Sequence, residues 1–192
     1  MRTIIYCCGL LLCSVSALAE NWQLRAEDSH LTFTSVKNAT IAENHHFNVI
    51  TGKVTNNQDV AISIDLSSVD SGIEIRDQRM KEHLFDVAQF RYATISSQLN
   101  SQLLNDLKVG EMKDFESKAT VALKGVEKSL SIKVRVHKLA ANMLTVSTLE
   151  PVLVQANDFN LIAGILKLQQ LAKLGSIDAV VPVTFNLVFD KQ

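Results

Sequence analysis

The chain has 192 residues, of which 20% are charged, and its formal net charge is −1. A charge balance this close to neutral excludes the strongly basic surface with which proteins bind nucleic acids or anionic membranes. The length suits a single domain, and no repeat, low-complexity tract or linker divides the sequence.

The first 19 residues have the pattern of a secretory signal peptide. Arg2 precedes an apolar run over residues 4–15, and Ala17-Leu18-Ala19 is an Ala-x-Ala cleavage site. The run is too short for a membrane span, which needs about 20 apolar residues. We therefore expect residues 1–19 to be removed and residues 20–192 to form one exported domain in the periplasm. All three cysteines lie in residues 1–19, so this domain has neither a disulfide nor a thiol nucleophile.

Alternation of apolar and polar residues with period two dominates residues 20–192. Such runs, together with two shorter strand-like segments, cover residues 22–25, 31–34, 49–54, 60–67, 93–98, 115–123, 130–137, 144–147 and 181–190. A link around Gly125 is typical of a hairpin. Closely spaced strands without intervening helices predict an all-β antiparallel sandwich or barrel of eight to ten strands.

The charged segment at residues 71–86 breaks this alternation and predicts a short helix. Ser71 and Glu74 fit a capping box, in which Ser71 is the N-cap and the Glu74 side chain reaches back. Asp77 and Lys81 have the spacing of a favourable i,i+4 ion pair. The charges of this segment are thus interpreted as helix-stabilising.

Residues 159–174 predict a second helix, because apolar residues recur on one of its faces. Asn157 or Asp158 is expected to cap its start and Gly175 its end. We expect this helix to cover one end or edge of the barrel.

A metal site could be drawn from Glu43, His45, His46 and His83. Adjacent histidines on a strand point to opposite faces, so His45 and His46 make a poor ligand pair. We therefore expect histidines on the surface at the barrel rim, and no metal.

Catalytic patterns are sparse in this sequence. No Gly-x-Ser-x-Gly motif is present, and Asp70 and Asp86, which could be drawn as a carboxylate pair, flank a predicted helix, where charges have structural roles. The inward positions of the alternating runs hold no titratable side chain, so we predict that the protein is not an enzyme.

An ordered set of short motifs spans nearly all of residues 20–192. It comprises Asp28-Ser29-His30-Leu31-Thr32-Phe33, Phe47 followed by Gly52, Ser67 to Ser71 followed by Arg76-Asp77, Leu84 to Val87, Phe90 to Ile95, Leu123 to Val126, Val152 to Phe159 and Val181 to Phe189. The set resembles the YceI-like family of exported lipid- and polyisoprenoid-binding proteins. The chain departs from the family pattern at Lys37, where many relatives carry histidine, and at Arg91, where proline is usual.

The resemblance implies a lipocalin-like antiparallel β-barrel of about eight strands, whose apolar interior holds an isoprenoid chain of the polyprenyl or quinone type. We assign the cavity wall to inward aromatic and aliphatic residues, namely Phe33, Ile62, Ile64, Phe85, Ile95, Val121, Leu144, Phe185 and Leu187. Met80 and Leu84 are expected at the cavity mouth. Arg76 and Asp77 are expected to form a structural pair that docks the first helix on the barrel.

Two functions remain open at this point. In the first, the protein is a non-catalytic exported carrier that sequesters an isoprenoid lipid or quinone and needs no other cofactor. In the second, the barrel is filled by side chains, and its helical end contacts a membrane-protein partner. Hollow and filled barrels share one sequence pattern. No nucleic-acid partner is expected, whereas a homodimer or a transient membrane contact is compatible with either function.

Overall fold

The computed structural model describes the chain except for residues 1–20, 56, 100–103 and 105, so the predicted signal peptide lies outside the described residues. Most described residues belong to strands of one antiparallel sheet. These strands are β1 (Trp22–Leu24), β2 (His30–Lys37), β3 (Ile41–Phe47), β4 (Ile50–Val54), β5 (Asp59–Asp65), β6 (Val69–Asp70), β7 (Tyr92–Gln98), β8 (Met112–Leu123), β9 (Val126–Ala140), β10 (Met143–Thr148), β11 (Val152–Gln155) and β12 (Val180–Lys191).

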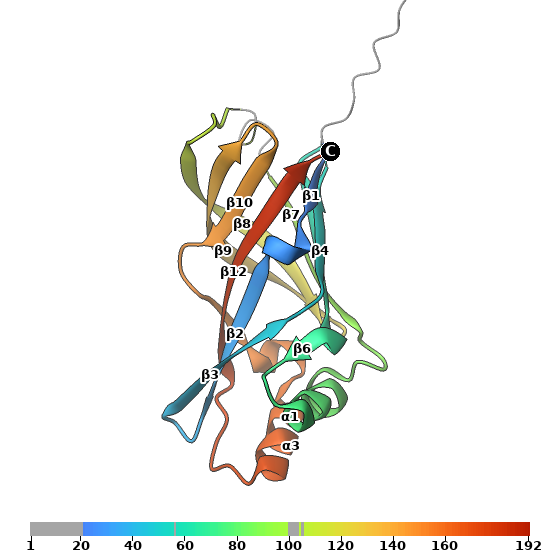
Figure 1. Cartoon of the computed structure of the whole chain (residues 1–192). Coiled ribbons are helices and arrows are strands. Elements are labelled where there is room, and N and C mark those ends of the chain that lie inside the picture. Colours follow the sequence, from blue (N-terminus) through green and yellow to red (C-terminus); the bar gives the residue numbers. More distant parts are fainter. Residues whose placement is uncertain (1–20, 56, 100–103, 105) are drawn as a thin grey trace, which may run out of the picture.

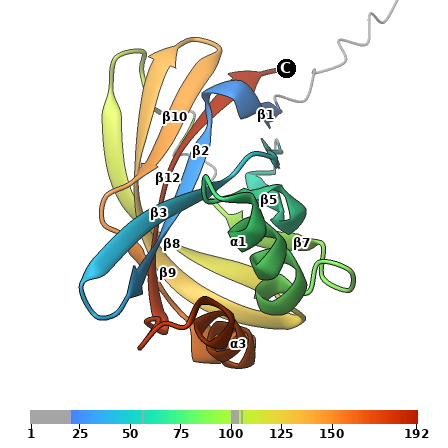
Figure 2. The ribbon, with the colours of Figure 1, turned by 60° about the horizontal axis from the view of Figure 1, so that its bottom comes forward.

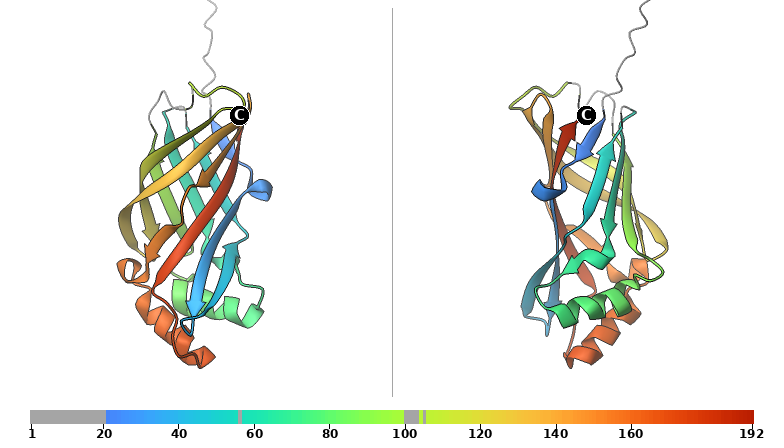
Figure 3. Two further views of the ribbon diagram at one scale, coloured as in Figure 1. Left: turned by 90° about the vertical axis from the view of Figure 1, so that its left-hand side faces the viewer. Right: turned by 45° about the vertical axis from the view of Figure 1, so that its right-hand side comes forward.

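The sheet closes on itself because β1 pairs with both β4 and β12. The order around the ring is β1-β4-β5-β7-β8-β9-β10-β12. Toward one end, β2 continues the wall between β12 and β3, β3 pairs with β6, and β11 pairs with β12. The result is the closed eight-stranded antiparallel barrel that was predicted (Figure 1 and Figure 3).

The alternating sequence produces this wall directly. In β4, for example, Ile50 and Val54 point inward and are buried, whereas Thr51 and Lys53 are exposed. Gly52 lies between the two buried side chains, and a Cβ atom there would lie 2.4 Å from Cδ1 of Ile62. The glycine thus leaves the space that the Ile62 side chain fills.

Helical segments gather at one end of the barrel (Figure 1 and Figure 2). Helix α1 (Glu74–Arg79) continues into the π-helical segment η3 (Met80–Phe85), and α3 (Ile162–Ala172) packs against η3. The described residues also include three short 3-10 segments, namely η1 (Ala26–Asp28), η2 (Leu66–Ser68) and η4 (Ala156–Phe159). Of the described residues, none belong to a helix long and apolar enough to cross a membrane.

The start of α1 differs from the predicted capping box. Its N-cap is Ile73, without a side-chain cap, and Glu74 does not reach back to Ser71. Instead, the Ser71 backbone N–H and hydroxyl both donate to the Asp77 carboxylate. Asp77 is thus occupied with the turn before the helix, and no ion pair joins it to Lys81 among the described residues.

The ends of α3 also differ from the prediction. Asn157 and Asp158 belong to η4, so the helix begins later, with Leu161 as its N-cap. It ends at Lys173, which adopts the left-handed conformation that was expected of Gly175. The helix therefore starts later than predicted, because a separate 3-10 turn precedes it.

Candidate functional site

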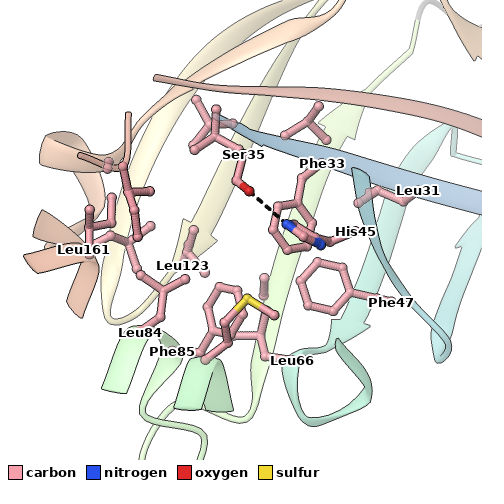
Figure 4. A pocket seen from close by; sticks show the side chains of 18 of the residues that line it. Leu31, Phe33, Ser35, His45, Phe47, Leu66, Leu84, Phe85, Leu123 and Leu161 are labelled. Atoms are coloured by element: carbon pink, nitrogen blue, oxygen red, sulfur yellow. Dashed lines mark hydrogen bonds between the residues drawn. The ribbon is translucent and has the colours of Figure 1, made fainter. Parts of the chain in front are cut away.

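A cavity of about 420 Å³ lies inside the barrel beneath the helices. Strands from around the barrel wall it, and η3 and α3 contribute the side chains that cover it (Figure 4). Its volume falls within the range of about 300–1,000 Å³ that small-molecule sites occupy. The barrel is therefore hollow at its helical end.

Most of the predicted wall residues line this cavity, namely Phe33, Ile64, Phe85, Ile95, Val121 and Phe185. The predicted mouth residues Met80 and Leu84 line it as well. Contact of any of these side chains with a ligand stays a prediction.

Three predicted wall residues lie elsewhere. Ile62, Leu144 and Leu187 are buried, but they belong to the packed core and do not line the cavity. Ile62 packs over Gly52, and Leu144 is only 1% exposed, opposite Phe189 on the neighbouring strand. All three point inward as predicted, but at a level of the barrel where side chains fill the interior.

Three phenylalanines pack the cover of the cavity, which is formed by η3 and α3, against the barrel wall. The ring centroids of Phe33 and Phe47 are 5.3 Å apart, and the Phe85 ring lies 6.5 Å from Phe33 and 5.8 Å from Phe47. Such aromatic contacts stabilise packing beyond the area they bury. Phe85 ends η3, so the cluster holds this segment against β2 and β3 (Figure 4).

The two covering helices also contact each other closely. A Cβ atom at Gly164 of α3 would lie 2.6 Å from the carbonyl oxygen of His83 and 2.7 Å from Cα of Leu84. Only glycine permits this approach. From the cavity side, Leu84 of η3 and Leu161, at the N-cap of α3, both line the interior.

The predicted Arg76–Asp77 pair does not form. Arg76 donates from Nε to the Ser71 hydroxyl at 2.7 Å, from Nη2 to the Ser71 carbonyl at 2.5 Å and from Nη1 to Oε2 of Glu43 at 2.8 Å. The Asp77 carboxylate instead accepts a hydrogen bond from the Ser71 backbone N–H. Arg76 therefore docks α1 on the barrel as predicted, but its acidic partner is Glu43 of β3.

Glu43 is shared by two cations. The Lys37 ammonium lies 2.7 Å from the same Oε2 atom that Arg76 contacts. The hydrogen bond from Lys37 and the charge of Arg76 hold the pKa of Glu43 below its ordinary value, although burial opposes this shift. All three residues line the cavity, so Lys37, where the sequence departs from the family pattern, has an ionic role at the wall.

His45 lies inside the barrel, so the prediction that it is a surface histidine was wrong. It is 2% exposed and lines the cavity, while the side chain of its neighbour His46 is 51% exposed. Nε2 of His45 lies 2.8 Å from Oγ of Ser35, and Nδ1 has no hydrogen-bond partner within the described part of the chain. Burial, followed by the charge of Arg76, lowers the pKa of His45.

The cavity wall is thus less purely apolar than the sequence predicted. Its titratable side chains are Lys37, Glu43, His45, Arg76, Arg79 and Asp178. The alternation of Glu43, His45 and Phe47 was the signal that places His45 on the inner face. Across the part of the chain that the structure describes, no cluster of three or more His, Cys, Asp or Glu side chains could hold a metal ion.

A closed eight-stranded antiparallel barrel with a mainly apolar cavity under two helices places the protein among the cavity-containing β-barrels. Residues 22–189 match the family model for the YceI-like domain. The chain belongs to the YceI-like family.

Solved structures agree with this assignment. A polyisoprenoid binding domain from Saccharophagus degradans, implicated in plant cell wall breakdown, is 34% identical to the chain with a TM-score of 0.87, and the match covers 89% of this chain and 98% of that domain. Burkholderia cenocepacia BcnA is 15% identical, with a TM-score of 0.65 and coverage of 86% and 98%.

The Campylobacter jejuni YCEI protein is 12% identical, with a TM-score of 0.56 and coverage of 82% of this chain and 90% of that protein. At such low identities, this protein and BcnA show the shared fold alone. No curated protein matches the chain.

Proposed function

We propose that this protein is an exported carrier that sequesters an apolar isoprenoid lipid, of the polyprenyl or quinone type, inside its barrel without catalysing a reaction. The observation that carries the proposal is the apolar-walled cavity of about 420 Å³ beneath η3 and α3. The similarity to a polyisoprenoid binding domain over 89% of the chain supports the class of ligand. The signal-peptide pattern of residues 1–19 supports export to the periplasm.

Apolar contacts alone can supply the free energy of such binding. Transfer of a methylene group from water stabilises by about 0.8 kcal/mol, so the roughly 15 to 20 carbons of three or four isoprene units contribute about 12 to 16 kcal/mol. Association and ordering cost about 4 to 15 kcal/mol of this amount. A prenyl chain in the cavity therefore supplies useful affinity without a catalytic group.

Among the residues that the structure describes, the Ser35–His45 hydrogen bond is the one contact that resembles catalytic machinery. A serine nucleophile needs a base that a third group orients, usually a carboxylate on the other ring nitrogen. Nδ1 of His45 has no such partner among the described residues. This geometry supports binding rather than acyl transfer.

The alternative of a filled barrel that serves only as an interaction module is disfavoured by the cavity. Organic extraction of the protein, purified from the periplasm of an expressing cell and analysed by mass spectrometry, tests the proposal. We expect an isoprenoid lipid that is missing from a mock purification without the protein. Recovery of no lipid, followed by failure to load either a prenyl quinone or a polyprenyl phosphate, would refute it.

A further inference from the structure

We propose that the Ser35 hydroxyl, oriented by His45, donates a hydrogen bond to an uncharged carbonyl oxygen of the bound isoprenoid, so that the site selects a prenyl quinone. This inference rests on the proposed function and names the head group that the cavity recognises. Ser35 belongs to β2 and His45 to β3, and both line the cavity beside Phe33 (Figure 4).

The tautomer of His45 follows from its surroundings. Its ring is buried, so one nitrogen carries a proton and the other does not. No described residue forms a hydrogen bond with Nδ1, and a buried N–H group without an acceptor is rarer and more costly than a buried lone pair without a donor. The proton therefore belongs on Nε2, which donates it to Oγ of Ser35 at 2.8 Å.

This direction of donation leaves the Ser35 proton free. A serine hydroxyl has one proton to donate and two lone pairs to accept with. His45 occupies one lone pair, and no other side-chain hydrogen bond of Ser35 is found among the described residues. Since Ser35 lines the cavity, its O–H group is a donor placed where a ligand acceptor can reach it.

The charges around Ser35 favour an uncharged acceptor. Glu43 lies directly opposite Ser35 in the pairing of β2 with β3. The cations nearest to this carboxylate, Lys37 and Arg76, both bind it, and every side-chain nitrogen of Arg76 is already engaged. With His45 neutral, a phosphate at Ser35 would lie beside the Glu43 carboxylate, whose two cations are already paired with it, whereas an uncharged carbonyl needs no cation.

The remaining charged groups of the wall are one cation and one carboxylate. Arg79 makes a single long contact of 3.5 Å to the Leu171 carbonyl of α3, and Asp178 adds another negative charge to the lining. A quinone carbonyl thus fits the subsite better than a phosphate does.

Calorimetric titration with three ligands of equal prenyl length tests the inference: a prenylated benzoquinone, a prenyl monophosphate and the hydrocarbon without a head group. We expect the wild-type protein to bind the quinone roughly tenfold more tightly than the hydrocarbon, since one hydrogen bond contributes about that ratio. Ser35→Ala should abolish this ratio. Thr34→Val removes the neighbouring hydroxyl, which bonds Asn44 outside the cavity, and should keep the ratio.

His45 is a positioning residue, and two variants separate that role from packing. His45→Phe keeps a ring beside Phe33 but removes the N–H group, and should lose the quinone preference. His45→Gln keeps an N–H donor near the position of Nε2, and should retain most of it.

The outcomes distinguish the two proposals. Equal affinities for quinone and hydrocarbon, tighter binding of the phosphate, or a Ser35→Ala protein that retains the preference would overturn this inference while leaving the proposed function intact. Failure of all three ligands to bind would overturn both.

Discussion

Gly164 of α3 lies directly against the backbone of Leu84 in η3, so that a Cβ at position 164 would come within 2.7 Å of the Leu84 Cα atom. Leu84 lines the cavity, and the same contact therefore sets the distance between the two helices that cover it. The cover is one packed unit.

Gly164→Ala should therefore destabilise the protein. Alanine favours a helix by about 1 kcal/mol over glycine, but here its Cβ would overlap backbone atoms that cannot rotate away. We expect a net loss of about 1–3 kcal/mol in the free energy of unfolding, as for other overpacked sites, measured by denaturant titration.

Gly175→Ala is the matched control for this substitution. Its Cβ would lie 3.4 Å from Oδ1 of Asn38, an ordinary contact, so the free energy of unfolding should change by no more than about 0.5 kcal/mol. Equal effects of the two substitutions would contradict the close helix packing.

Ile95→Glu should reduce lipid loading at least tenfold, because it places a carboxylate on the apolar wall, where ionised groups are costly to bury. Ser96→Glu, on the next position of β7, points outward and should load like the wild type. Lipid content per protein, measured after extraction, checks this difference. Loading of the Ile95→Glu protein at the wild-type level would show that the ligand does not occupy the cavity.

Arg76→Lys should loosen the cover. One ammonium group cannot donate at once to the Ser71 hydroxyl, the Ser71 carbonyl and Glu43, as the guanidinium does. Amide hydrogen exchange over residues 74–85 should become about tenfold faster, which corresponds to the loss of one or two hydrogen bonds.

Arg79→Lys serves as its control, because Arg79 makes a single long contact of 3.5 Å to the Leu171 carbonyl. Exchange over residues 74–85 should stay close to the wild-type rate in this protein. Unchanged exchange in Arg76→Lys would mean that the Glu43 contact does not hold α1 in place.

Asp65 and Arg91 give the fold a defined acid sensitivity. Burial opposes ionisation of Asp65, but hydrogen bonds from Arg91 and Ser67 outweigh it and lower the pKa of the carboxyl below its ordinary value of 3.8. The unfolded chain therefore takes up the proton first as the pH falls. The stabilisation is complete above pH 3.8 and is lost below it, as the pH falls through the pKa of the folded state.

Asp65→Asn should lower the thermal midpoint at pH 7, and its difference from the wild type should shrink as the pH falls below about 3.8. Asp114→Asn breaks the exposed pair with Arg135 and should have a smaller effect, because solvent screens that pair. Thermal unfolding followed by circular dichroism from pH 7 to pH 2 checks both. A pH-independent difference for Asp65→Asn would contradict this assignment.

The barrel could be predicted because alternation reports which face of a strand each side chain occupies. It does not report depth along the barrel axis, so Leu144 and Leu187 were placed at the cavity although they fill the packed end. Similarly, the pairing of Arg76 with Glu43 joins residues 33 positions apart and depends on where β3 meets α1, which local spacing does not encode.

His45 illustrates the opposite case. Its alternation with Phe47 was a signal of an inward orientation, but the prediction rested on the adjacent histidine pair and wrongly placed His45 on the surface. The contact with Ser35 could not be predicted, because it requires the register of β2 with β3, which brings Ser35 opposite Glu43 and next to His45.

Native mass spectrometry of the mature protein mixed with a prenyl quinone tests the central claim most directly. An apolar cavity that holds one isoprenoid chain should give a complex with one ligand per chain, and the Ile95→Glu protein should give far less of it than the Ser96→Glu protein does. Spectra that show only the ligand-free protein, or equal complex formation by both variants, would contradict the claim that the barrel cavity is the binding site.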